Sequence, residues 1–96
     1  MRFAAAMAVM LALIGQADAA EPTPVGLSSC SGCHATGATV ETPVPRLVGR
    51  NPAEIVAAMQ EFRSGKRPTT VMDRIVRGFS DDEIEAIAAW YGAQRD

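Results

Sequence analysis

Two cysteines and a histidine lie within five residues of one another and form the most reactive group of side chains in the sequence. They belong to the segment Cys30-Ser31-Gly32-Cys33-His34, and His34 is the single histidine of the chain. On a helical turn, residues i, i+3 and i+4 share a face, so both thiols and the imidazole can reach one flat ligand. The C-x-x-C-H order is typical of covalent haem attachment, in which each thiol adds to a vinyl group. The spacing therefore predicts one covalently bound haem c at Cys30, Cys33 and His34.

Three other sites use paired cysteines at this spacing: a structural disulfide, a thiol-redox pair and half of a zinc site. A closed zinc site needs four ligands, and the chain holds only 2 cysteines and 1 histidine. A thioredoxin-like site would need a βαβ pattern, which the sequence does not show. The haem interpretation is therefore favoured over these alternatives.

The second iron ligand decides whether a haem carries electrons or binds small molecules. Outside the first 19 residues, only Met59 and Met72 offer a thioether. Met59 shares an apolar face with Ile55 and Phe62, where a core role explains it. Met72 follows a polar loop that could carry it to the haem, and a core role is its alternative. We expect His34 and Met72 to bind the iron, with Met72 raising the reduction potential.

The apolar periodicity predicts an all-α fold, with three main helices and a short fourth wrapped around the haem. The first helix should span residues 27–34, and the short one residues 72–77. Asn51 and Ser80 are N-cap residues that open the other two helices, and Gly65 ends the helix that begins after Asn51. The inward stripe of the last helix consists of Ile84, Ile87, Ala88 and Tyr91.

The first residues differ in character from the rest of the chain. Arg2 is followed by an apolar run of twelve residues, 3–14, and then by small residues that match a signal-peptide cleavage site after Ala19. A membrane-spanning helix needs about 20 apolar residues, so we expect a cleaved signal, a periplasmic location and no membrane anchor in the mature form. The expected organisation is a signal peptide over residues 1–19, a flexible lead-in over 20–26 and a haem-binding domain over 27–96.

Charge separates along the chain although the totals nearly balance. There are 9 basic and 11 acidic residues, a net charge of −2, which excludes a nucleic-acid binder on charge grounds. Seven basic residues lie in 46–77, whereas 80–96 holds five acids. Arg63, Lys66 and Arg67 could neutralise haem propionates or steer a partner, and ordinary solvated faces are the alternative.

These motifs together resemble a class I cytochrome c over nearly all of the chain beyond the leader. The resemblance rests on the C-x-x-C-H motif, Pro45-x-Leu47-x-Gly49, Met72 and a terminal amphipathic helix that carries Trp90-Tyr91. It implies that the carbonyl group of Pro45 accepts a hydrogen bond from His34, which would fix the ring and its basicity. Pro45 therefore joins the expected cofactor site.

A narrower similarity points to the cytochrome subunit of flavocytochrome c sulfide dehydrogenases. It lies in Phe62-x-Ser64-Gly65 and in Thr70-x-Met72-x-Arg74-Ile75-x-x-Gly78-Phe79-Ser80. It implies an electron-transfer subunit, with no enzymatic activity alone, that takes electrons from a sulfide-oxidising flavoprotein and passes them to a downstream acceptor. The alternatives are a free-standing carrier between a dehydrogenase and a terminal oxidase, and a haem sensor or peroxidase-like protein with an open iron. Met72 argues against the open iron.

Overall fold

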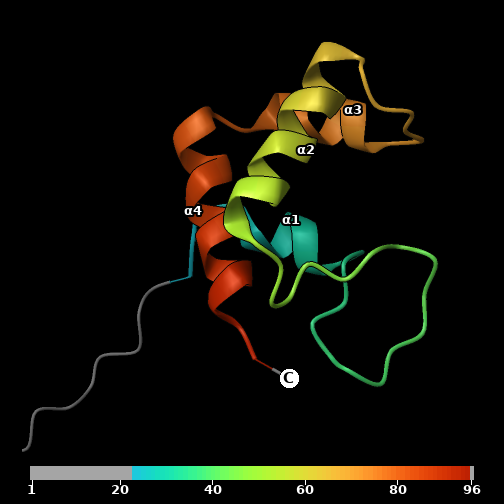
Figure 1. The fold of residues 1–96 in the computed structure, drawn as a ribbon, viewed down its shortest axis with the longest axis vertical. Helices are drawn as coiled ribbons and strands as arrows, with labels where there is room; N and C mark the ends of the chain where they lie inside the picture. Colours follow the sequence, from blue (N-terminus) through green and yellow to red (C-terminus); the bar gives the residue numbers. More distant parts are fainter. Residues whose placement is uncertain (1–22, 96) are drawn as a thin grey trace, which may run out of the picture.

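The computed structural model describes residues 23–95, and within that range it contains helices and no strand (Figure 1). The elements are α1 (Leu27–Ser31), α2 (Pro52–Ser64), α3 (Met72–Ile75), the 3-10 helix η1 (Val76–Gly78) and α4 (Asp81–Ala93). The long helices α2 and α4 pack on each other, and α3 and η1 pack against α2. The prediction of an all-α fold is confirmed. The expected signal peptide, 1–19, lies outside the described residues.

No helix within residues 23–95 has both the length and the apolar character needed to cross a bilayer. The helices that are present are defined by local signals at their ends.

The start of α2 is fixed by its flanking residues. The side chain of Asn51 accepts a hydrogen bond from the backbone N–H of Ala53 at 2.9 Å, and Pro52 takes the first helical position. At the other end, Gly65 adopts a φ of 77°, and its N–H bonds to carbonyls of the last turn. These are the N-cap and C-cap signals that the sequence contains.

The start of α4 is a complete capping box. The Ser80 hydroxyl accepts a bond from the N–H of Glu83 at 3.2 Å, and the Glu83 carboxylate accepts one from the N–H of Ser80 at 2.9 Å. Both bonds hold the first turn of α4 in register. The bond from the backbone N–H of Ser80, followed by a hydrogen bond with the Ser80 side chain, lowers the pKa of the Glu83 carboxyl.

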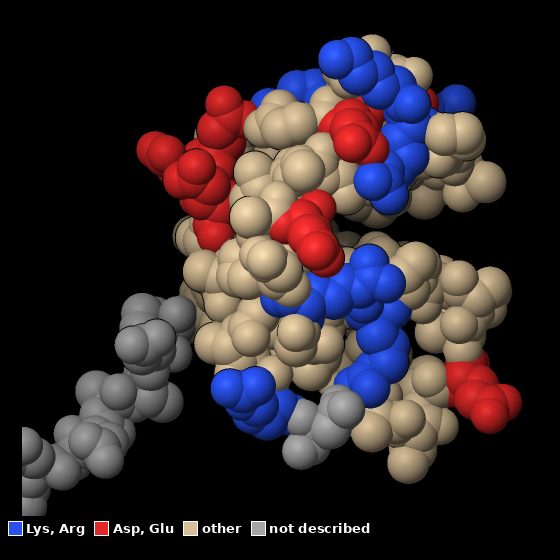
Figure 2. Space-filling view, in the orientation of Figure 1, with Lys and Arg blue, Asp and Glu red and all other residues tan. Residues whose placement is uncertain are grey.

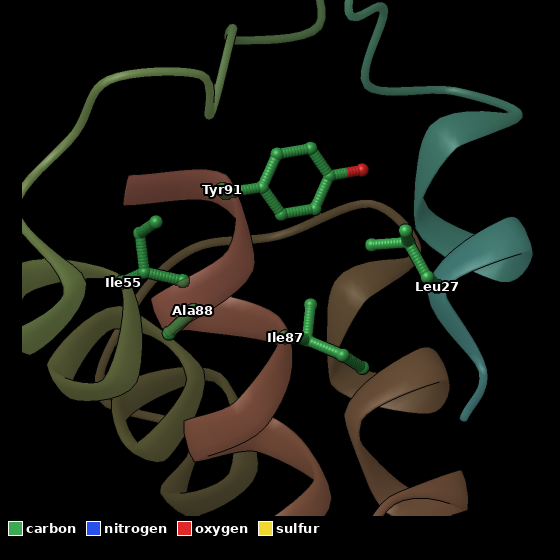
Figure 3. Close-up of a cluster of buried hydrophobic side chains, with 5 residues drawn as sticks. All are labelled: Leu27, Ile55, Ile87, Ala88 and Tyr91. Carbon is green, nitrogen blue, oxygen red and sulfur yellow. The ribbon is translucent and has the colours of Figure 1, made fainter. Parts of the chain in front are cut away.

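The core lies between α1, α2 and α4 (Figure 3). Its central members are Leu27, Ile55, Ile87, Ala88 and Tyr91. Ala88 and Tyr91 are completely inaccessible to solvent. α1 therefore joins the core through the buried Leu27 and the partly buried Cys30, while α4 supplies the predicted apolar stripe.

Two glycines permit close approaches that a side chain would block. Gly26 precedes α1 with a φ of 83°, and a Cβ there would lie 2.3 Å from the ring of Phe79. At Gly92, a Cβ would lie 2.6 Å from Cγ of Pro52. The end of α4 therefore rests directly on the start of α2.

Arg63 joins α2 to the beginning of α4. Its guanidinium group donates to the Asp81 carboxylate and, at 2.9 Å, to the backbone carbonyl of Phe79. Gln60 also donates to Asp81, at 3.1 Å. The sequence suggested a haem or a partner as the target of Arg63, and the structure instead places it in this link.

The bonds from Arg63 and Gln60 to Asp81 predict that the folded protein loses stability in acid. The hydrogen bond from Arg63 and then that from Gln60 lower the pKa of the Asp81 carboxyl below its usual 3.8. A lowered folded-state pKa contributes stability that is complete above the usual value and disappears as the pH falls through the lowered one. Asp81→Asn should therefore be less stable than wild type at pH 7, and the two should converge at a pH well below 3.8.

Urea unfolding at both pH values measures this difference, with Asp82→Asn as the control on the same exposed turn. The account is contradicted if the two variants lose the same stability at pH 7.

Candidate functional site

The two cysteines and the histidine lie on α1 and on the turn that follows it. α1 ends at Ser31, three residues before the predicted end at His34. The N–H groups of Cys33 and His34 both donate to the carbonyl of Cys30, at 3.1 and 2.8 Å. The helical coil therefore continues as one tighter turn, which keeps positions i, i+3 and i+4 together.

His34 is held by a backbone carbonyl. Its Nδ1 lies 2.6 Å from the carbonyl oxygen of Pro45. Because a carbonyl can only accept, Nδ1 carries the proton and Nε2 keeps the lone pair that a metal needs. Next to this bond, Arg46 donates to the carbonyl of Thr36 at 3.2 Å. The two contacts close the loop that follows the histidine.

A cavity of about 450 Å³ brings together all five of the residues that the sequence singled out. The five are Cys30, Cys33, His34, Pro45 and Met72. Other parts of its wall come from Val44, Val71 and Ile75. Its volume lies within the usual range for cofactor pockets, about 300–1,000 Å³, and such pockets are mostly apolar with few polar groups.

Two smaller cavities, of about 30 and 140 Å³, share His34 and Met72 with the large one. The smallest is lined by apolar core residues that include Ile55, Ile84 and Ile87. Met59 lines both smaller cavities and packs against the core cluster. Met72 borders all three cavities, whereas Met59 does not border the large cavity of about 450 Å³.

The loop before Met72 is anchored at several points. The Thr69 hydroxyl accepts a hydrogen bond from the N–H of Met72 at 2.9 Å. Arg67 bonds to the Glu61 carboxylate at 2.7 Å and lies over the ring of Phe62, 5.6 Å from its centroid. These contacts tie the loop to α2 and so fix where the thioether enters the cavity.

Positive charge borders the cavity of about 140 Å³, whose wall contains Arg50 and Arg67 together with Glu54. Figure 2 shows a hollow with basic side chains on both of its sides, while acidic side chains gather over the start of α4. Arg67 was an expected propionate partner, and Lys66 is not part of this wall. Arg50 was missed by the sequence reasoning, although it directly precedes the N-cap of α2.

Both cysteines are free thiols in the structure. Cys33 is exposed, whereas burial raises the pKa of the Cys30 thiol, so that Cys30 is protonated at neutral pH. Two thiols, an imidazole with a free Nε2 and a thioether thus border one apolar space. This donor set fits a haem c, with His34 and Met72 available to the iron.

Comparison with known proteins gives the same family. No protein-family model matches the chain. A cytochrome c-554(548) of Halomonas halodenitrificans is 30% identical over 71% of this chain and 87% of its own length. The cytochrome subunit of sulfide dehydrogenase of Chlorobaculum tepidum is 38% identical over 67% of this chain. A cytochrome c4 of Pseudomonas aeruginosa is 28% identical over 88% of this chain.

The lengths of these relatives differ. The chain spans 58% of the Chlorobaculum tepidum protein and 44% of the cytochrome c4. The similarity nevertheless covers most of the described helices and includes the segment that borders the large cavity. The fold, the cavity and these similarities together show that the chain belongs to the class I c-type cytochromes and that its cofactor is a covalently bound haem c.

Proposed function

We propose that this chain is a periplasmic one-electron carrier and the electron-transfer subunit of a sulfide-oxidising flavoprotein complex. Cys30 and Cys33 hold the haem, and His34 and Met72 bind its iron. The observation that carries the site is the shared cavity of about 450 Å³, which all of these residues and Pro45 border. The leader expected over residues 1–19 supports export.

Each residue has a separate task at this site. The bound haem supplies a one-electron couple at its iron. Pro45 holds the His34 ring in the tautomer whose Nε2 can bind a metal, through the contact of 2.6 Å. Met72 adds a soft thioether, which favours the reduced iron and raises the potential. The mostly apolar wall lowers the polarity around the site, which also favours the less charged state of the iron.

The flavoprotein partner follows from electron counting together with one relative. Sulfide oxidation to the level of sulfur removes two electrons, which a flavin can take together and a haem can accept only one at a time. A carrier that follows a flavin therefore divides a two-electron step into single transfers. A relative of this chain is a cytochrome subunit of sulfide dehydrogenase, and that similarity supports this partner.

A free-standing carrier is the second candidate. It is supported by the cytochrome c-554(548), because this chain spans 87% of that protein. The two candidates differ in how the partner is held. A permanent subunit depends on apolar burial and resists salt, whereas a transient carrier depends on charges that salt screens.

Val71 offers an apolar contact for a permanent partner. The residue is 51% exposed, yet it borders the large cavity next to Met72. An exposed valine at the mouth of a redox site can be buried by a docking protein. We therefore expect Val71→Asp to weaken binding to the flavoprotein about tenfold, whereas Asp82→Lys on α4 should have little effect.

The experiment is a pull-down of the haem-loaded chain with the candidate flavoprotein at low and high ionic strength, followed by sulfide-dependent haem reduction. A permanent subunit should retain the flavoprotein in high salt and be reduced by sulfide. Recovery of the cytochrome alone, with no reduction after the flavoprotein is added back, would favour the free carrier. If Val71→Asp and Asp82→Lys weaken binding to the flavoprotein equally, docking at the cavity mouth is contradicted.

A further inference from the structure

The hydroxyl group of Tyr91 is buried without a hydrogen-bond partner among residues 23–95. Figure 3 shows the ring reaching from α4 toward α1, with its oxygen on the side of α1. Buried hydroxyls in folded proteins are nearly always paired, because the lost bonds to water are otherwise not replaced. An acceptor for this hydroxyl is therefore expected on α1.

The side chains packed in this cluster offer few acceptors. Leu27 and Ile87 are hydrocarbon, and Trp90, which meets the Tyr91 ring edge-on with centroids 5.1 Å apart, can only donate. Two sulfur atoms belong to the cluster, those of Met59 and Cys30. Met59 lies on α2, whereas Cys30 lies on α1.

A second observation relates Tyr91 to Cys30, because the Cys30 side chain packs against the cluster to which Tyr91 belongs. Burial also raises the pKa of the Tyr91 hydroxyl to about 12, so Tyr91 remains a neutral donor over the physiological pH range. What it can donate to depends on the chemical state of the sulfur.

Haem attachment changes that state. The sulfur of Cys30 bonds to a vinyl carbon, and the thiol proton goes to the neighbouring vinyl carbon, so no electrons are gained or lost overall. A thiol is both a weak donor and a weak acceptor, whereas the resulting thioether can only accept. Once haem is attached, the Cys30 sulfur has no proton to donate and can only accept a hydrogen bond from the Tyr91 hydroxyl.

We propose that the Tyr91 hydroxyl donates a hydrogen bond to the thioether sulfur of Cys30 and thereby raises the reduction potential of the haem. This inference rests on the proposed attachment of haem at Cys30. The positive end of the O–H dipole would point at the sulfur that holds the haem and would favour the added electron, as hydrogen bonds to sulfur do at other iron centres. Tyr91 is a positioning and tuning residue, because it does not contact the iron.

The test compares Tyr91→Phe with Leu27→Val in the haem-loaded protein. Tyr91→Phe keeps the ring and removes only the hydroxyl, while Leu27→Val trims another buried member of the same cluster that lines none of the three cavities. We expect Tyr91→Phe to lower the affinity for the electron about threefold, which is about 30 mV at 59 mV per tenfold. Leu27→Val should change the stability and leave the potential unchanged.

Proton NMR of the reduced protein adds a direct readout. The expected result is a slowly exchanging hydroxyl proton close to the Cys30 β protons, present in wild type and absent in Tyr91→Phe. An unchanged potential in Tyr91→Phe, an equal shift in Leu27→Val, or a hydroxyl proton that lies near another acceptor would overturn the inference.

A separate measurement keeps the two proposals distinguishable. Mass spectrometry of the digested wild-type protein shows whether the haem is bonded to Cys30. Absence of that bond would refute the proposed attachment, whereas its presence together with an unchanged Tyr91→Phe potential would refute only the role of Tyr91.

Discussion

Met72→Ala should lower the reduction potential by roughly 100 mV or more, a fraction of the about 0.8 V over which axial ligands tune haem iron. Loss of the thioether removes the ligand that favours reduced iron and leaves a coordination position open. The variant should therefore bind carbon monoxide when reduced and cyanide when oxidised. Redox titration and ligand-difference spectra measure both effects in the haem-loaded protein.

Met59 provides the matched control, because it is the other methionine that borders the smaller cavities. Met59 is only partly buried, so Met59→Ala should cost about 2 kcal/mol, the low end for a core methionine. Its potential and its resistance to carbon monoxide should remain near those of wild type. If Met59→Ala instead loses the sulfur-to-iron charge-transfer band while Met72→Ala keeps it, the ligand assignment is reversed.

Changing both Cys30 and Cys33 to serine should leave the chain largely unfolded. Without the covalent links the haem is no longer held in the protein. The walls of the large cavity, which include His34 and Met72, then have no ligand to pack against. The described core has only seven buried apolar residues, which is little for a chain of this size to depend on. We expect loss of most helical circular dichroism and of a cooperative melt.

The single change Cys33→Ser serves as the control, because Cys33 is exposed and Cys30 still offers one attachment point. It should retain haem and most of its helix content, with a lower melting temperature. A haem-free double mutant that keeps wild-type helix content and melts cooperatively would show that the helices do not need the cofactor.

Signals that act within a few residues predicted much of the fold. Asn51 and Ser80 mark the starts of α2 and α4 through bonds to residues two and three positions away. The stripe that ends at Tyr91 follows from helical periodicity alone, and every residue of that stripe is buried. The spacing of Cys30 and Cys33 likewise predicted that both lie on one turn, and the coil continues through Cys33 although α1 itself ends at Ser31.

What the sequence could not supply depends on contacts between distant segments. The partner of Arg63 is Asp81, 18 positions later, so nothing near Arg63 shows that α4 will engage it. Arg50 borders a cavity wall that forms only when the loop before α2 meets the loop carrying Arg67. The unpaired hydroxyl of Tyr91 is visible only after α1 and α4 have packed.

The loop between Thr36 and Pro45 leaves room for evolutionary insertion. Its two ends are pinned by the bonds from Arg46 to Thr36 and between His34 and Pro45, while residues 36–43 are exposed. Doubling the length of a flexible loop costs only about 0.6 kcal/mol in closure entropy. Homologues can therefore acquire extra segments here, such as a recognition hairpin, while the imidazole keeps its orientation.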